Sequence, residues 1–319
     1  MKIGILGGGN CYALNLANEA HKKFDVFGIG RSPARVPAMW QVYKEYRYYE
    51  AHIVFHLQAV LAILDTERPE YIVNFAAQGE GQGSFSDTAD LFYQTNTLAL
   101  VRLVKELRKR PYLKRFIQVG TSELYGSVTS PSKETDPICP TSPYAVSKAA
   151  FDLHLDILRR VHGFPATVVR PSNAYCVGQQ LHRIIPRAII CALSGKRLPL
   201  QGGGRAQKTY LHASDLSRAI LLLLTSEPGI YNCGADKPIA IRNLVEVCMN
   251  ACGVKFDDGV DVVDDRVGQD GCYWLDSSKL KALGWEAKIM KKDGIEKMVQ
   301  WVEKHPELLT MDYEWKVRP

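Results

Sequence analysis

Two groups of polar residues near the middle of the chain have the types and spacing needed to oxidise an alcohol. Thr121 and Glu123 directly follow the apolar segment 115–119, and Tyr144 and Lys148 lie four residues apart further along. Residues i and i+4 share one face of a helix, so the lysine charge favours the tyrosinate. A tyrosinate placed in this way removes a proton from an alcohol while a nicotinamide accepts the hydride.

A glycine-rich segment at the start of the chain predicts a site for that nicotinamide cofactor. The apolar stretch 2–6 runs into GGGNCYA, in which the positions of a G-x-x-G-x-x-G loop are Gly7, Asn10 and Ala13. Gly7 permits the tight turn, and asparagine tolerates the left-handed backbone that the second position would need. A glycine-rich turn that binds nothing is the alternative. The residues assigned to the cofactor loop are Gly7, Gly9, Asn10, Cys11 and Tyr12.

The second predicted strand indicates which cofactor is preferred. VFGIGR places Gly30 where an acidic residue would bind the adenosine ribose, and Arg31 follows it. Arginine pairs with a 2′-phosphate through charge-assisted bidentate hydrogen bonds. Arg31 therefore favours NADP, with NAD as the alternative cofactor. Arg31 could also be a solvated side chain at the start of a loop, with no cofactor contact.

The elements that must position these residues alternate between strand and helix. This order predicts a doubly wound parallel α/β sheet of the Rossmann type over residues 1–172. A smaller α/β substrate-binding part is expected over 173–319, and the segment 210–233 is expected to return to the first domain. The expected strands are 2–6, 24–29, 71–75, 115–119, 166–169 and 230–233, and the expected helices are 12–23, 57–66, 91–109, 143–162, 184–193, 214–224, 241–251 and one within 285–305.

Size and composition bound the class of protein. The chain has 319 residues, 46% of them hydrophobic, and a net charge of +6. The basic residues are dispersed, which argues against nucleic acid and suits an anionic small substrate. The eight cysteines show no zinc-ligand spacing, so no metal site is expected. We expect the cysteines to be reduced. No signal peptide or membrane span is expected, so the predicted location is cytoplasmic.

Nearly the whole chain resembles the extended short-chain dehydrogenase/reductase family, in particular its nucleotide-sugar-modifying members. The motifs are VNFAAQ, TSELYG, SPYAVSK, RPSNAY, LQGGGRAQKTYLHASDL and DDRVGQD. Further cofactor contacts implied by the resemblance are Ala76, Ala77, Gln78, Asn96, Tyr144, Lys148 and Arg170. Substrate contacts implied by it are Gln78, Thr121, Asn173, Arg187, Lys208 and Arg266, the last two at its diphosphate-binding segments.

The triplet Thr121–Ser122–Glu123 narrows the subclass, because epimerase relatives usually carry a small or apolar residue at the third position. Together with the AAQ…SF stretch and Arg31, it resembles GDP-mannose 4,6-dehydratases most. The implied reaction is oxidation at C4, deprotonation at C5, loss of water and return of the hydride to C6. Tyr144 would be the base for the C4 hydroxyl and Glu123 the base at C5, whereas Ser122 stands where one subgroup has a stronger acid.

Several alternatives remain open. UDP-glucuronate decarboxylases carry a similar triplet, so a 4-reductase, 4-dehydrogenase, epimerase or decarboxylase is possible, as is a non-catalytic NADP-sensing protein. Thr121, Ser122, Glu123 and Asn173 could be turn residues, and Lys208 and Arg266 surface charges. Departures from the family pattern lie at the glycine loop, at AHIVFH near Ile53 and His56, at Cys176 and at Gly271. The expected partners are a nucleotide-diphosphate sugar, preferably GDP-linked, and a second copy of the chain in a homodimer or higher oligomer.

Overall fold

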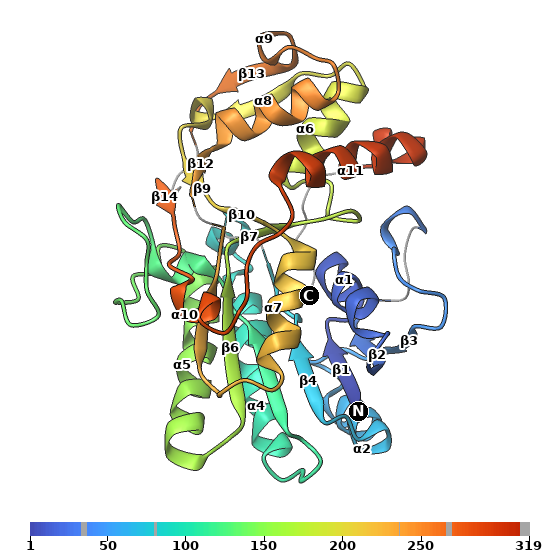
Figure 1. Ribbon diagram of the computed structural model, residues 1–319, viewed down its shortest axis with the longest axis vertical. Coiled ribbons are helices and arrows are strands. Elements are labelled where there is room, and N and C mark those ends of the chain that lie inside the picture. The colour runs from blue at the N-terminus through green and yellow to red at the C-terminus, as the bar shows by residue number, and fades with distance from the viewer. Residues whose placement is uncertain (33–36, 80–81, 236, 266–269, 313–319) are drawn as a thin grey trace.

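The computed structural model describes residues 1–32, 37–79, 82–235, 237–265 and 270–312. Its central layer is a seven-stranded sheet with the order β11-β6-β5-β4-β1-β2-β3, and every neighbouring pair of these strands is parallel. Helices cover both faces (Figure 1). The strands are β1 Lys2–Leu6, β2 Asp25–Gly30, β3 Arg47–Glu50, β4 Tyr71–Asn74, β5 Arg115–Val119, β6 Ala166–Pro171 and β11 Ile230–Cys233.

Two hydrophobic clusters hold the helices against the sheet. One joins side chains of α1 and α7 to one face, and the other joins α2, α4 and α5 to the opposite face. The expected doubly wound parallel fold is therefore present. The helices of these two layers are α1 Cys11–Ala20, α2 Leu57–Glu67, α3 Ala89–Tyr93, α4 Ala99–Leu107, α5 Pro143–His162 and α7 Ala213–Leu223.

The predicted helix 91–109 is divided by a π-helical turn at Gln94–Leu98. Asn96 is fully buried in this turn, and its amide forms hydrogen bonds with the backbone of Gln78 and the hydroxyl of Ser147. A π-turn inserts one residue into the helical repeat and is frequent at functional sites. Periodicity alone could not show this interruption, because apolar residues continue on both sides of it.

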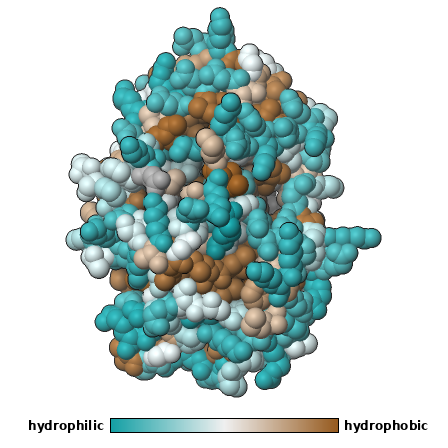
Figure 2. Space-filling model, in the orientation of Figure 1, coloured by the Kyte–Doolittle hydropathy of each residue, from teal (hydrophilic) through white to brown (hydrophobic). Residues whose placement is uncertain are grey.

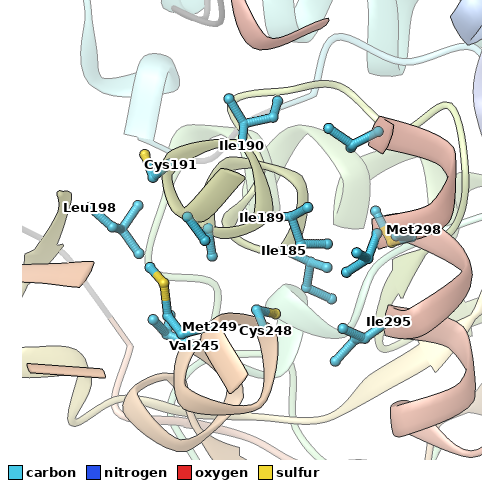
Figure 3. Packing of buried hydrophobic residues seen from close by; sticks show 14 of the residues in the cluster. Ile185, Ile189, Ile190, Cys191, Leu198, Val245, Cys248, Met249, Ile295 and Met298 are labelled. Carbon is cyan, nitrogen blue, oxygen red and sulfur yellow. The ribbon is translucent and has the colours of Figure 1, made fainter. Parts of the chain in front are cut away.

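The rest of the chain forms a smaller layered unit above the carboxyl ends of the strands (Figure 1). Its core gathers side chains from α6, α8 and α11, with Ile189, Cys248 and Met298 among them (Figure 3). Short strands complete it, and the sequence pattern did not predict these. Its elements are β7 Asn173–Tyr175, α6 Ile184–Leu193, β8 Leu198–Gln201, β9 Gln207–Lys208, β10 Tyr210–His212, β12 Ile239–Ala240, α8 Ile241–Ala251, α9 Phe256–Gly259, β13 Val260–Val263, β14 Cys272–Tyr273 and α11 Lys291–Lys304. The short helix α10 Ser278–Lys281 packs against β11 of the central sheet instead.

Helix α5, which carries the Tyr-x-x-x-Lys motif, has well-defined ends. The Ser142 hydroxyl accepts from the Ala145 N–H, Pro143 begins the helix, and Gly163 ends it with a left-handed φ of 63°. A capping serine, a proline in the first turn and a terminal glycine are the signals that favour these boundaries. The motif is thereby held on the first two turns of a firmly bounded helix.

Most of the surface shown in Figure 2 is hydrophilic, with one larger hydrophobic patch below its middle and smaller ones in its upper half. No helix among the described residues is long and apolar enough to cross a membrane.

Candidate functional site

A cavity of about 1420 Å³ lies at the carboxyl ends of the central strands and extends to the smaller unit. In open α/β sheets this edge is where ligands bind. Most of the predicted site residues border this one cavity. They are Gly7, Gly9, Asn10, Cys11, Tyr12, Arg31, Ala76, Ala77, Gln78, Thr121, Glu123, Tyr144, Lys148, Asn173, Arg187 and Lys208.

Four predicted residues are not part of this lining. Asn96, Ser122 and Arg170 are buried behind the cavity wall, and Arg266 lies outside the described residues. Asn96 and Arg170 do not lie on the cavity surface, but they form hydrogen bonds with residues near it. Asn96 holds the backbone of Gln78 through two hydrogen bonds, of 2.8 and 3.0 Å.

The glycine loop begins as expected. Gly7 has a φ of +73°, and a Cβ atom there would lie 2.6 Å from the Ala76 nitrogen, so only glycine fits. At Asn10 the expectation of a left-handed backbone is wrong, because its φ and ψ are −90° and 157°. Its side-chain oxygen accepts from the Ala13 N–H at 2.9 Å and caps α1. Asn10 is therefore a helix cap that also borders the cavity.

The end of β5 places Thr121 and Glu123 together at the cavity. The Thr121 hydroxyl oxygen accepts from the Glu123 N–H at 3.2 Å, which caps a short 3₁₀ turn over Ser122–Tyr125. Thr121 is buried and Glu123 half-buried. The turn directs residues 121 and 123 to the cavity and leaves Ser122 behind them.

Tyr144 and Lys148 border the same cavity from the first turns of α5. Lys148 is only 2% exposed, and its ammonium donates to the Val119 carbonyl at 2.7 Å. Burial lowers the pKa of Lys148 to about 8, and the nearby Asp152 carboxylate opposes this shift. The Tyr144 ring packs edge-on against Phe92, with ring centroids 6.3 Å apart.

A buried ion pair lies beneath Lys148. Arg170 Nε is 3.3 Å from Asp152 Oδ2, and both side chains are almost completely buried. Arg170 also donates to the Tyr125 hydroxyl at 2.7 Å. Burial raises the pKa of the Asp152 carboxyl, and Arg170 and Lys148 act in the opposite direction. The Asp152 carboxylate of this pair thus acts on the Lys148 ammonium, and Arg170 links Asp152 to Tyr125.

At the far end, described residues that the sequence analysis did not assign join Lys208. Its ammonium lies 4.7 Å from the centroid of the Tyr273 ring, a cation–π contact. The Asp270 carboxylate accepts from the hydroxyls of Tyr273 and Thr141, each at 2.6 Å. All of these side chains border the cavity. The DDRVGQD motif, which contains Asp270, was the signal that could have identified them.

Aromatic residues also line the cavity that Arg31 borders. Trp40 and Tyr48 border the cavity, and the Tyr48 hydroxyl donates to the Ser32 carbonyl at 2.5 Å. Of the departures noted at AHIVFH, Ile53 lines the cavity and His56 does not. Among the described residues no cluster of three or more possible metal ligands occurs.

The chain is similar to known nucleotide-sugar enzymes. Residues 6–234 match the NAD dependent epimerase/dehydratase family. A dTDP-glucose 4,6-dehydratase from Streptomyces niveus is 34% identical over 234 residues, covering 72% of this chain and 69% of that protein. A trifunctional UDP-glucose 4,6-dehydratase/3,5-epimerase/reductase from Arabidopsis thaliana is 31% identical over 254 residues, but the chain spans only 38% of its length.

Solved structures of nucleotide-sugar enzymes are also similar to this chain. A crystal structure of dTDP-glucose 4,6-dehydratase from Bacillus anthracis in complex with NAD has a TM-score of 0.85 and 28% sequence identity. The similarity covers 96% of this chain and 98% of that one. The dTDP-glucose 4,6-dehydratase DesIV from Streptomyces venezuelae, with NAD and TYD bound, has a TM-score of 0.86 at 26% identity.

Proposed function

The chain belongs to the NAD dependent epimerase/dehydratase family, and from this membership we propose that it is a nucleotide-diphosphate-sugar 4,6-dehydratase. It is an enzyme of the nicotinamide-dependent nucleotide-sugar dehydratase and epimerase class. The observation that carries the finer proposal is Glu123, a carboxylate on the same cavity as Thr121, Tyr144 and Lys148. Epimerisation at C4 needs no base at C5, whereas elimination across C5 and C6 does.

The nicotinamide cofactor fits the residues present. Gly7 and Gly9 border the cavity without side chains, and the positive φ of Gly7 permits the tight turn between them and β1. Gly9, Asn10 and Cys11 continue that surface at the start of α1, where backbone N–H groups favour an anion. We propose that these residues hold the pyrophosphate and that Arg31 binds a 2′-phosphate, which favours NADP over NAD. When bound, the nicotinamide would accept hydride from C4 and supply it to C6.

The residues of this chain divide the proton chemistry between them. Thr121 accepts a hydrogen bond from Glu123 N–H, so its own hydroxyl hydrogen can be donated to the C4 oxygen of the sugar. Tyr144 removes the proton of the C4 hydroxyl, and the Lys148 ammonium stabilises the phenolate. Once C4 is a ketone, the C5 proton is acidic enough for the Glu123 carboxylate to remove it. Glu123 then protonates the departing C6 hydroxyl, which leaves as water, because Ser122 does not border the cavity. When C6 is reduced, C5 takes up one proton, and this balances the proton that Tyr144 removed from the C4 hydroxyl.

We propose that residues 173–319, apart from the segment 210–233 that is expected to belong to the first domain, hold the nucleotide diphosphate. Asn173, Arg187 and Lys208 border the cavity on this side. The cation–π contact with Tyr273 holds the Lys208 ammonium at the cavity edge, where it can pair with phosphate. Arg266, which follows β13, belongs to this proposal on its sequence motif alone.

The nucleotide base is the least constrained feature. The motif TSELYG and Arg31 favour a GDP-linked sugar, whereas the similar enzymes named above act on dTDP- and UDP-linked glucose. The test is to incubate the purified protein with GDP-mannose, dTDP-glucose and UDP-glucose, each with NADP or NAD. A product lighter by one water supports the dehydratase, and preference for GDP-mannose supports the GDP proposal. A 4-epimer of unchanged mass, or a reduced or decarboxylated sugar, contradicts the dehydratase.

We further propose that the enzyme is a homodimer that pairs through α5. Four apolar side chains on this helix are exposed by 39 to 66%: Val146, Leu153, Ile157 and Val161. Their spacing of seven, four and four residues places them on one helix face. Leu98 adds an exposed apolar side chain from the helical segment packed beside α5. A second copy of this chain, presenting the same stripe, would cover this face.

A further inference from the structure

Two cysteines that are far apart in the sequence meet at the wall of the cavity. Cys11 is the first residue of α1, and Cys176 follows β7. They form a small buried cluster with Ala213, and Tyr12 packs against it. Both thiols are free, with 6% and 2% of their residue surfaces exposed.

Neighbouring contacts fix the two segments against each other. The Tyr12 hydroxyl donates to the Ala174 carbonyl at 3.0 Å, which ties the first turn of α1 to β7. Beyond Cys176, an ideal Cβ on Gly178 would lie 3.7 Å from the Cys11 Cβ. Cys176 therefore lies between two residues that touch the start of α1. These contacts hold the two thiols in one packed cluster between neighbouring segments.

The two cysteines differ in access. Cys11 borders the cavity, and Cys176 does not. The hydrogen bond with Cys11 and burial both raise the pKa of the Cys176 thiol, so it reacts poorly with an oxidant by itself. A small oxidant that enters the empty cavity would reach the Cys11 sulfur first. Cys176 would then be positioned to resolve the oxidised Cys11.

We propose that Cys11 and Cys176 are an oxidative modification site that closes to a disulfide when the cofactor loop is vacant. With hydrogen peroxide as oxidant, the Cys11 sulfur attacks one peroxide oxygen, the O–O bond breaks and Cys11 becomes a sulfenic acid as water leaves. The Cys176 sulfur then attacks the Cys11 sulfur; the S–S bond forms, the S–O bond breaks, and the hydroxyl leaves with the Cys176 proton as a second water. Two thiols and one peroxide thus give one disulfide and two waters.

This bond would connect the start of α1, which belongs to the proposed pyrophosphate-binding loop, to the turn that follows β7. A bound dinucleotide covers the Cys11 side of the cavity and blocks entry of peroxide. The two thiols would therefore be protected while the dinucleotide is bound, and oxidation would join them by a disulfide when it is not. Formation of the bond itself does not depend on the dehydratase proposal.

The experiment treats the full chain with a small excess of hydrogen peroxide and maps peptides without reduction. We expect a Cys11–Cys176 cross-linked peptide and a loss of about two mass units from the intact chain. Cys11→Ala and Cys176→Ala should each abolish this peptide, since alanine suits these small buried positions, and circular dichroism checks their folding. Cys139→Ala, which removes an exposed thiol of the same chain, should leave it unchanged.

A second arm adds NADP or NAD before the peroxide. We expect the cross-link yield to fall at least about fivefold in proportion to occupancy of the site. Cys11 oxidised to a sulfinic acid with Cys176 still reduced would overturn the disulfide. A yield that stays constant while cofactor binding is shown by fluorescence titration would overturn the protection, and dehydratase assays on the same sample report separately on the proposed function.

Discussion

The Lys148 ammonium donates to the Val119 carbonyl at 2.7 Å, joining the first turns of α5 to the last residue of β5. Val119 lies two residues before Thr121, so this one bond ties the Tyr-x-x-x-Lys helix to the strand end that carries Thr121 and Glu123. The bond uses one of the three ammonium hydrogens and leaves the others available in a nearly water-free position. It therefore fixes the position of the lysine that we propose supports Tyr144.

The first prediction concerns the pH dependence of catalysis. The pKa of Lys148 is about 8, so the ammonium is present below that pH and is lost as the pH rises through it. If this charge supports the phenolate, kcat/KM should decline above about pH 8. Asp152→Asn removes the carboxylate that raises the pKa of Lys148, so the decline should begin at lower pH. Asp156→Asn, on the same helix but paired with Arg159 and Arg160, is the control and should leave the profile in place.

Glu123→Gln should separate oxidation from elimination. Glutamine keeps the shape of the side chain but cannot remove the C5 proton, so we expect the dehydrated product to fall at least about a hundredfold. Oxidation at C4 should continue, and the reduced cofactor should accumulate in stopped-flow absorbance. Tyr144→Phe should lose both signals. Glu286→Gln, at an exposed position, is the control and should behave as wild type. Dehydration at the normal rate in Glu123→Gln would show that Glu123 is not the base at C5.

The fold and several of the residues that border the cavity could be predicted from local patterns. The alternation of apolar strands with amphipathic helices is a local property, and so are the Gly7 turn and the i, i+4 spacing of Tyr144 and Lys148. These features need only neighbouring residues, and the structure has the predicted doubly wound sheet.

Other features depend on contacts between distant segments, and no local pattern shows them. The π-turn at Asn96 exists because its amide reaches Gln78 on another loop. Arg170 was predicted to contact the cofactor from its motif, but it turns inward to the Asp152 carboxylate. The proximity of Cys11 to Cys176 likewise follows from the docking of β7 against α1. For Asn10 the predicted left-handed backbone was wrong for a different reason. Its backbone is extended, and in this conformation its side chain caps α1.

Asn10 also yields a prediction for stability. Its side chain caps α1 through the Ala13 N–H, so Asn10→Ala should lower the free energy of unfolding by about 1 kcal/mol. Asn10→Gly should cost only a few tenths of that amount, because glycine is also tolerated at a helix cap. Denaturant unfolding monitored by circular dichroism measures both. An unchanged free energy of unfolding in Asn10→Ala would show that the cap contributes little.

Arg31→Ala tests the choice of cofactor. A charge-assisted pair with the 2′-phosphate contributes about 1.5–3 kcal/mol, so NADP affinity should fall by about 10- to 100-fold. NAD lacks this phosphate, and its affinity should change by less than about threefold. Isothermal titration of both cofactors gives the comparison, and Arg205→Ala, at an exposed position outside the cavity, is the control. Equal losses for the two cofactors would contradict the NADP preference.

The apolar face of α5 gives the last prediction. Leu153 and Ile157 are half exposed and lie one turn apart on the stripe that we propose pairs with a second copy. Replacing both with glutamate would place four like charges at a two-fold interface, because each copy contributes the same residues. We expect the wild-type chain to have the mass of a dimer in light scattering and the double variant that of a monomer. Arg160→Ala alters a polar, exposed position of the same helix and should remain dimeric. A wild-type chain that is monomeric at all concentrations would rule out this interface and leave the stripe without an assigned partner.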